Sequence, residues 1–296
     1  MSHLCESALA ALELSDHDRM LRIRSSPWIW YPRAAEILEA LNDLFTHPKS
    51  HRMPNMLITG STNNGKTAIA RAFIKQHPTI SEPEDEADVV PVLYIQAPPV
   101  PDERRFNAVL LDQLRIPHKV NERADRMAQQ FLHMAPKLGV RMLIVDEIHH
   151  ILAAPALKQR AFLQLLKYFG NELLIPIVAI GTEDALYALQ SDSQIANRFR
   201  PAVIPEWKFN GDFLALLRSF EETLPLKYPS DLTEVKLASR IPSLSEGLIG
   251  EIGTLLKTAA MFAVRSKDEK ISLSLIDKLQ WAEPSQRRIR ASQLVS

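Results

Sequence analysis

The sequence is poor in the features that mark secreted and membrane-bound proteins. It contains one cysteine, Cys5, which excludes an internal disulfide and favours a reducing compartment. No apolar run approaches the roughly 18–20 residues that a membrane-spanning helix needs. Several acidic residues near the N-terminus argue against a signal peptide. We therefore expect a cytoplasmic protein that makes no membrane contact.

An excess of positive charge is also lacking, because 35 Lys and Arg residues balance 35 Asp and Glu residues. A protein without a net positive field must contact DNA through a local basic patch, or by repeating that patch in an oligomer. The 296 residues are 46% hydrophobic and 24% charged, which is ordinary for a soluble globular protein. This length accommodates one large α/β domain and a smaller second domain.

Apolar runs alternate with helical patterns through the middle of the chain. Such alternation predicts a parallel sheet with helices on both faces, in which ligands bind at the carboxyl ends of the strands. We expect strands at 55–59, 89–95, 140–145, 173–180 and 202–207, and helices at 67–76, 122–138, 156–169 and 183–190.

The regions that flank this α/β pattern are mainly helical. The leader contains two helical patterns, one on each side of Ser25–Pro32, and a small helical lid is expected from residue 210 onward. Residues 78–91 are acidic and rich in proline, which predicts a solvated loop. We expect an N-terminal helical leader at 1–54, an α/β nucleotide-binding core at 55–207, a helical lid at 208–282 and a basic tail at 283–296.

The segment Gly60–Thr67 matches the phosphate-binding pattern G-x-x-x-x-G-K-[ST]. Its glycines let backbone N–H groups face phosphates, Lys66 supplies a positive charge, and the following helix presents its positive end. A chance match is the alternative, although the segment lies between a predicted strand and a predicted helix. We expect the nucleotide to contact Gly60, Ser61, Thr62, Asn63, Asn64, Gly65, Lys66, Thr67 and Ala68.

An acidic pair, Asp146-Glu147, follows the apolar run 140–145. Asp146 and the Thr67 hydroxyl are the expected holders of Mg²⁺, while Glu147 would act as the general base that polarises the attacking water. A solvated acidic pair at the end of a strand is the alternative reading. Because the pair includes its own base, the sequence favours an ATPase that uses ATP and Mg²⁺ over a GTPase-like switch.

Several polar residues nearby have two readings each. Thr182 either senses the γ-phosphate or caps the following helix. Two arginines, Arg198 and Arg200, are surface charges in a monomer, but in an oligomer one can reach the neighbour's nucleotide as an arginine finger. We prefer Arg198 for that role, with Arg200 as the alternative. We expect His149 and His150 to lie at a helix start or on the surface rather than to bind a metal.

These motifs, in this order, resemble those of the AAA+ superfamily, and more closely those of the TniB and TnsC proteins, the ATPase regulators of bacterial transposons. The resemblance spans about residues 20–265. Its most specific parts are Asn63-Asn64 and the segment Pro27–Pro32. The matching residues are Arg24–Ala34, Arg52–Gly60, Thr62–Thr67, Leu143–His150, Gly181-Thr182 and Asn197–Pro201.

The resemblance implies an ATP-dependent protein that binds double-stranded DNA, assembles head to tail with itself and recruits a transposase of the TniA or TnsB type. It also implies communication with a TniQ-type target selector. In relatives the DNA contacts follow the second strand, which points to Arg104, Arg105, Lys119 and Asn121; a solvated loop and helix start is the alternative reading. The lid segment 245–251 lacks the arginine common in AAA+ proteins, which fits a slow switch better than a motor.

Other features leave alternatives open. The aromatic residues Trp28, Trp30 and Tyr31 either pack near the adenine or the lid hinge, or belong to the core. The tail Arg287–Arg290 either binds DNA or the transposase, or is solvated. A helicase loader or replication initiator and a nucleotide-switch scaffold without hydrolysis are the competing functions. Residues 266–296 are too few for the winged helix of an initiator, and Glu147 argues against the scaffold.

Overall fold

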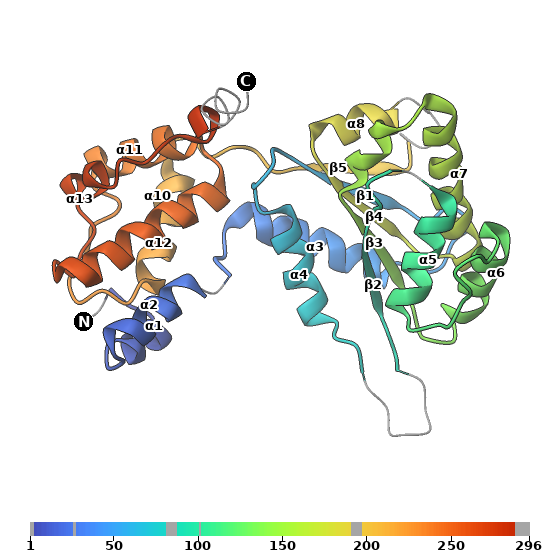
Figure 1. Ribbon diagram of the computed structural model, residues 1–296, viewed down its shortest axis with the longest axis horizontal. Helices are drawn as coiled ribbons and strands as arrows, with labels where there is room; N and C mark the ends of the chain where they lie inside the picture. Colours follow the sequence, from blue (N-terminus) through green and yellow to red (C-terminus); the bar gives the residue numbers. More distant parts are fainter. Residues whose placement is uncertain (1–2, 26–27, 81–87, 101, 191–196, 288–296) are drawn as a thin grey trace. The chain divides into compact units, whose positions relative to one another are not determined.

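A computed structural model describes residues 3–25, 28–80, 88–100, 102–190 and 197–287 (Figure 1). The chain divides into two compact units that each contain segments distant in the sequence. We name them the sheet unit, Glu36–Ser61 with Lys66–Ile204, and the helical unit, Met1–Ala35 with Thr62–Gly65 and Pro205–Ser296.

The sheet unit contains five parallel strands in the order β2-β3-β4-β1-β5 (Figure 1). Because β3, β4 and β1 are neighbours, the residues that follow these three strands meet at one edge of the sheet. The register keeps their ends level, with Thr59 opposite Gly181 and Val145 opposite Ala179. The strands are β1 (Asn55–Thr59), β2 (Val92–Gln96), β3 (Met142–Asp146), β4 (Ile177–Gly181) and β5 (Phe199–Val203).

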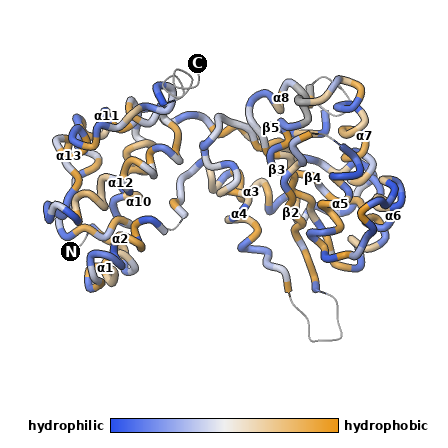
Figure 2. The backbone as a smooth tube through the Cα atoms, in the orientation of Figure 1, coloured by the Kyte–Doolittle hydropathy of each residue, from blue (hydrophilic) through white to orange (hydrophobic). Residues whose placement is uncertain are grey.

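Helices cover both faces of the sheet (Figure 2). The inner strands β1, β3 and β4 are therefore buried along their whole length. One face carries a hydrophobic core in which Phe106, Phe131 and Phe169 are fully buried. The other face packs against α3 and α4, which place the rings of Phe45 and Phe73 6.0 Å apart. These helices are α3 (Pro32–Thr46), α4 (Lys66–Gln76), α5 (Glu103–Gln113), α6 (Ala124–Met134), α7 (Ala156–Leu173) and α8 (Glu183–Gln190).

The helical unit joins the first two helices of the chain to the C-terminal helices. Arg19, which is 2% exposed, pairs with Glu269 at 2.5 Å. A buried charge is costly unless it is paired, so this ion pair ties the leader to the segment after α12. The helices are α1 (Glu6–Ala11), α2 (Asp16–Arg24), α10 (Gly211–Thr223), α11 (Val235–Ser245), α12 (Ile249–Ser266) and α13 (Leu273–Lys278). Among the described helices, none has the length and apolar character to cross a membrane.

The α/β class with a helical C-terminal region is confirmed, but three expected strands are placed differently. The strand expected at 173–180 is wrong at its start, because α7 continues to Leu173 and ends where Leu174 adopts a left-handed φ of 51°. The strand expected at 202–207 is β5, which begins at Phe199 and ends before Pro205. The strand expected from residue 89 begins at Val92, since Val89 pairs with Ile80 instead.

Two helical expectations also change. The leader pattern before Ser25 is divided into α1 and α2, and α5 follows β2, where a helix start was only the alternative reading. Other expectations concern residues outside the described part of the chain. These are Ser26 and Pro27 of the leader, 81–87 of the acidic loop, Ile195 and Ala196, and Arg288, Ile289 and Arg290 of the tail.

Candidate nucleotide site

The phosphate-binding motif forms a tight loop between β1 and α4. Gly60 has no room for a side chain, because a Cβ there would lie 2.6 Å from the carbonyl oxygen of Ile204. Gly65 adopts a φ of 83°, which favours glycine. Lys66 Nζ donates to the carbonyl oxygens of Gly60 at 2.8 Å and Ser61 at 2.7 Å. These two hydrogen bonds from the lysine side chain stabilise the conformation of the loop.

Lys66 is 8% exposed and is the first residue of α4. Burial lowers the pKa of this ammonium, while the carboxylates of Glu147 and Asp146 oppose the shift. A buried cation at the positive end of a helix is a strong binding site for an anion. Thr62 and Ala68, which were also expected to contact the nucleotide, are exposed.

The predicted metal ligands meet at the carboxylate of Asp146, which is 2% exposed. Its Oδ2 accepts hydrogen bonds from Thr67 Oγ1 and from the Tyr94 hydroxyl, each at 2.7 Å. Its Oδ1 accepts from the backbone N–H of Glu147 at 2.7 Å. A hydroxyl and a carboxylate are the oxygen ligands that Mg²⁺ prefers, so the donor set fits this ion.

The Tyr94 contact was missed by the sequence reasoning. Burial, and then the hydrogen bond to Asp146, raise the pKa of the Tyr94 hydroxyl. The group therefore stays protonated and remains a hydrogen-bond donor at neutral pH. A tyrosine inside a short apolar strand carries no sequence signal for such a role, because the contact depends on the pairing of β2 with β3.

Glu147 follows Asp146 with a left-handed φ of 57°, which turns the chain into the 3₁₀ helix η1 (Ile148–Ala153). Its Oε2 lies 3.2 Å from Nε2 of His149, whose Nδ1 is buried without a hydrogen-bond partner in the described structure. The ligand atoms of Glu147, His149 and His150 lie within 4.8 Å of one another. His149 thus contacts the expected general base, a contact that the sequence reasoning missed.

Thr182 follows β4 beside the phosphate loop. Its carbonyl oxygen accepts a hydrogen bond from Thr59 Oγ1 at 2.9 Å, so the end of β1 holds it in place. Its own hydroxyl is buried and has no hydrogen-bond partner in the described structure. The side chain therefore does not cap α8, and its hydroxyl is available to a ligand.

The two arginines at β5 differ in their surroundings. Arg198 Nη1 donates to Asn171 Oδ1 of α7 at 2.7 Å, and the arginine is partly exposed. Arg200 lies within β5, the strand at the edge of the sheet, and is exposed. An Arg198 finger would have to leave Asn171, whereas Arg200 is already at the surface. Nothing in the sequence pointed to Asn171.

The tip of the phosphate loop, Thr62–Gly65, belongs to the helical unit. The Asn63 carbonyl oxygen accepts from Gly250 N–H at 3.0 Å, and Asn63 Nδ2 donates to Glu251 Oε1 at 3.0 Å. Asn64 is buried, where its Nδ2 donates to the Pro205 carbonyl oxygen at 3.1 Å and its Oδ1 accepts from Ile249 N–H at 3.4 Å. Both asparagine side chains therefore fasten the loop within the helical unit, chiefly to the start of α12.

A Gly250→Ala variant is expected to weaken ATP binding about tenfold, because a Cβ at this position would lie 2.0 Å from Asn63 Oδ1. Displacing Asn63 would break two hydrogen bonds that are each worth about 1 kcal/mol. Titration with a fluorescent ATP analogue measures the change. Gly253→Ala is the matched control on the same helix, since its Cβ would meet nothing nearer than 3.6 Å. Equal affinities of the two variants would contradict a role for the Asn63 contact.

Aromatic residues from the leader gather around Trp207 in the helical unit. The ring of Tyr31 lies 5.3 Å from Trp207 and 6.2 Å from Trp28, and burial raises the pKa of Tyr31 to about 12. The Tyr31 hydroxyl and the indole N–H groups of Trp28 and Trp207 are buried without partners in the described structure. Trp30 is 57% exposed. Such unpaired donors are rare in native proteins unless a ligand or water satisfies them.

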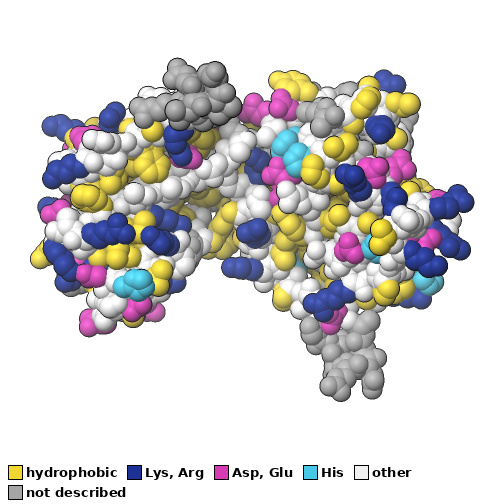
Figure 3. Space-filling model, in the orientation of Figure 1, with side chains coloured by type: hydrophobic (Ala, Val, Ile, Leu, Met, Phe, Trp, Pro, Cys, Tyr) yellow, Lys and Arg dark blue, Asp and Glu magenta, His cyan; other side chains and the backbone are white. Residues whose placement is uncertain are grey.

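The residues expected to contact DNA lie together on the sheet unit. The Arg104 guanidinium donates to the Val120 carbonyl oxygen and to Asn121 Oδ1, so the start of α5 meets the loop before α6. Arg104, Arg105, Lys119 and Asn121 are all exposed. Figure 3 shows Lys and Arg side chains gathered over α6 at the right-hand edge of the view.

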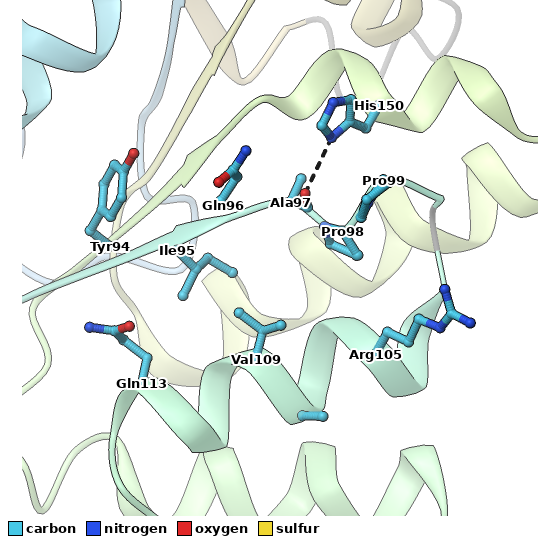
Figure 4. Close-up of a pocket in the computed structure, with 11 residues that line it drawn as sticks. Tyr94, Ile95, Gln96, Ala97, Pro98, Pro99, Arg105, Val109, Gln113 and His150 are labelled. Atoms are coloured by element: carbon cyan, nitrogen blue, oxygen red, sulfur yellow. Dashed lines mark hydrogen bonds between the residues drawn. The ribbon is translucent and has the colours of Figure 1, made fainter.

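Arg105 also lines a cavity of about 720 Å³ along the open edge of β2 (Figure 4). The cavity lies over α5 and ends near Ala97, whose carbonyl oxygen is 3.3 Å from His150 Nδ1. Tyr94 lines the same cavity, so the surface around α5 reaches the side chain that contacts Asp146.

The first residue of the basic tail, Arg287, is held within the helical unit. It pairs with Glu251 at the start of α12 and lies over the Trp281 ring, with its guanidinium carbon 5.4 Å from the ring centre. The lid segment 245–251 has no arginine of its own. Arg287 of the tail nevertheless lies at the start of α12, where it pairs with Glu251. The sequence did not predict this contact.

The model of a family described as "Bacterial TniB protein" matches residues 19–209, more than half of the chain. This protein belongs to the TniB family. None of the curated proteins matches its sequence.

Solved structures share the fold of this TniB-family chain at low sequence identity. The ORC2 protein of Aeropyrum pernix, in ADPNP–ADP complexes, has a TM-score of 0.60 and 16% identity over 87% of this chain and 70% of its own. The ORC1 protein of Aeropyrum pernix, in complex with DNA, has a TM-score of 0.60 and 17% identity over 86% and 66%. Cdc6p from Pyrobaculum aerophilum has a TM-score of 0.61 and 15% identity over 87% and 68%. The chain has the AAA+ fold and spans about two thirds of the length of these proteins.

Proposed function

We propose that this TniB-family protein is a Mg²⁺-dependent ATPase that oligomerises on double-stranded DNA and recruits a transposase. The observation that carries the proposal is the 2.7 Å hydrogen bond from Thr67 Oγ1 to Asp146 Oδ2, with Glu147 next in the chain. This bond brings the end of the phosphate loop to the acidic pair. Binding and hydrolysis groups that lie 79 residues apart in the sequence thus share one site.

Five residues of the sheet unit have defined roles in this proposal. Lys66 would exchange its two carbonyl partners for phosphate oxygens. Thr67 and Asp146 would hold Mg²⁺, which would supply positive charge beside the phosphates. Glu147 accepts a proton from the water that attacks the γ-phosphorus, and the bond to the β–γ bridging oxygen breaks. Thr182, whose buried hydroxyl has no hydrogen-bond partner in the described structure, would donate it to the γ-phosphate or to the water.

The choice of ATP is supported by the helical unit. The buried donors of Trp28, Tyr31 and Trp207 have no partners in the described structure, and an adenine ring offers nitrogen acceptors and a face for stacking. The ORC2 structure of similar fold contains ADPNP and ADP. Trp30, which is exposed, has no part in this proposal.

Contact with DNA is assigned to Arg104, Arg105, Lys119 and Asn121 on the sheet unit. The ORC1 structure of similar fold is a complex with DNA, which supports binding to DNA. The chain has no net charge, so a single subunit would bind weakly and repetition in a head-to-tail oligomer would supply affinity. An arginine finger from the neighbouring subunit, Arg198 or Arg200, would then join assembly to hydrolysis.

Replacing Arg104, Arg105 and Lys119 together by alanine is expected to weaken DNA binding and flatten its dependence on salt. Each lost phosphate contact reduces the slope of log K against log salt by about 0.9, because fewer counterions are released. ATP binding should be unchanged. Fluorescence anisotropy with duplex DNA at several salt concentrations measures both quantities.

A charge-matched control replaces three exposed basic residues elsewhere on the sheet unit, Lys75, Lys158 and Arg160. Its salt slope should equal that of the unsubstituted protein. An unchanged slope in the first variant would place the DNA on another surface.

The function itself is tested by ATP hydrolysis with and without duplex DNA, followed by capture of partners on DNA. We expect hydrolysis, and retention of an integrase-like transposase or a TniQ-type protein encoded by neighbouring genes when ATP is bound. Retention of a replicative helicase instead would favour a helicase loader. ATP binding without any hydrolysis would favour the nucleotide-switch scaffold.

A further inference from the structure

The strand β2 presents Tyr94 to the carboxyl edge of the sheet. Figure 4 shows Tyr94 and Gln96 on one side of the strand and Ile95 on the other, toward Val109 of α5. Leu93 and Ile95 are 0% and 2% exposed, so packing against the core fixes the strand. In the register of β2 with β3, Gln96 lies opposite Asp146. Tyr94 is two residues earlier on the same face, from which its long side chain reaches the aspartate.

The orientation of the Asp146 carboxylate depends on its hydrogen-bond donors. The last torsion of an aspartate side chain has a broad and weak preference, so it does not fix the plane of the two oxygens. Three donors do so here: the Glu147 N–H on Oδ1, and the hydroxyls of Thr67 and Tyr94 on Oδ2. An ionised carboxylate only accepts hydrogen bonds, so both hydroxyls are donors.

We propose that Tyr94 is a positioning residue of the Mg²⁺ site, which holds Asp146 in the orientation that the metal requires. The inference rests on the proposed ATPase function. The Thr67 hydroxyl has to serve the metal with its oxygen, whereas the Tyr94 hydroxyl has no other hydrogen-bond partner in the described structure. Tyr94 is therefore the donor dedicated to Asp146. Partners of this kind are typically worth a factor of about 10–100 in metal affinity.

The test compares Tyr94→Phe with the unsubstituted full-length protein by titrating Mg²⁺ against binding of a fluorescent ATP analogue. Phenylalanine keeps the shape of the ring and removes only the donor. We expect the Mg²⁺ concentration at half-maximal effect to rise about tenfold. Affinity for the analogue in EDTA should be unchanged, because within the described part of the chain the Tyr94 hydroxyl donates to Asp146 and to no phosphate-loop residue. Tyr187→Phe, which removes a hydroxyl from a side chain that is 69% exposed, is the control.

A double-variant cycle shows whether Tyr94 acts through Asp146. In an Asp146→Asn background, Tyr94→Phe should add no further shift in Mg²⁺ dependence, since the two residues form one unit. An additive effect in this cycle would overturn the inference, as would a Mg²⁺ dependence that Tyr94→Phe leaves unchanged. If the unsubstituted protein shows no Mg²⁺-dependent binding, the proposed function fails and the inference fails with it. Mg²⁺-dependent binding by the unsubstituted protein therefore separates failure of the Tyr94 inference alone from failure of the proposed function.

Discussion

A Glu147→Gln variant is expected to bind ATP normally and to hydrolyse it about 10²–10⁴ times more slowly, the usual contribution of a general base. Glutamine keeps the length of the side chain but cannot accept a proton from water. The structure supports retention of binding, because the bonds from Lys66 and Thr67 do not involve the Glu147 side chain. Steady-state phosphate release and equilibrium binding of the analogue measure the two properties separately.

Lys66→Ala is the companion variant, because it removes the buried cation and should lose ATP binding about a hundredfold or more. The two variants are therefore inactive for different reasons. The Glu147 variant should also form long-lived ATP-bound assemblies on DNA, whereas the Lys66 variant should form none. Unchanged turnover in Glu147→Gln would mean that another residue is the base, with His149, 3.2 Å from Glu147, as the next to replace.

An Arg198→Ala variant is expected to bind ATP as a monomer but to hydrolyse it about 10³–10⁵ times more slowly, the value of an arginine finger. Arg200 lies two residues from Arg198 and carries the same charge. Arg200→Ala is therefore the matched comparison. Hydrolysis is measured at protein concentrations that permit assembly on DNA.

Mixing Arg198→Ala with Glu147→Gln tests whether the finger acts on the neighbouring subunit. The first protein keeps an intact Glu147 site and the second keeps an intact Arg198. Junctions that bring these two groups together should recover part of the activity from two inactive proteins. A finger that acts within its own subunit cannot be rescued by mixing. Recovery with Arg200→Ala in place of Arg198→Ala would assign the role to Arg200.

The parts of the fold that the sequence predicted well are those with a sharp local signal. β1 was placed correctly because the apolar residues Met56, Leu57 and Ile58 are followed closely by Gly60, where the loop begins. The region around Leu173 was not, since apolar residues continue from α7 into β4 and periodicity cannot separate a helix end from a buried strand. β5 was shifted because it is an edge strand with three exposed residues and a proline, so its apolar signal is weak.

The residues of the candidate site also fall into those that the sequence predicted and those that it did not. The residues of the phosphate loop and the acidic pair were visible because their types and spacing are fixed by phosphate and metal chemistry. Tyr94, His149 and Asn171 were not visible, since each acts through a contact that exists only after strands and helices have packed. The bonds of Asn63 and Asn64 also join residues more than 140 positions apart in the sequence.

Residues Thr62–Gly65 belong to the helical unit, so the nucleotide site depends on more of the chain than its two motifs. A chain that stopped at Ile204 would keep both motifs intact. It would nevertheless lose Pro205, Ile249 and Glu251, which hold the two asparagine side chains within the helical unit. The two motifs are thus not sufficient to form the site on their own. Grafting the site onto another protein would require the C-terminal helices as well as the sheet.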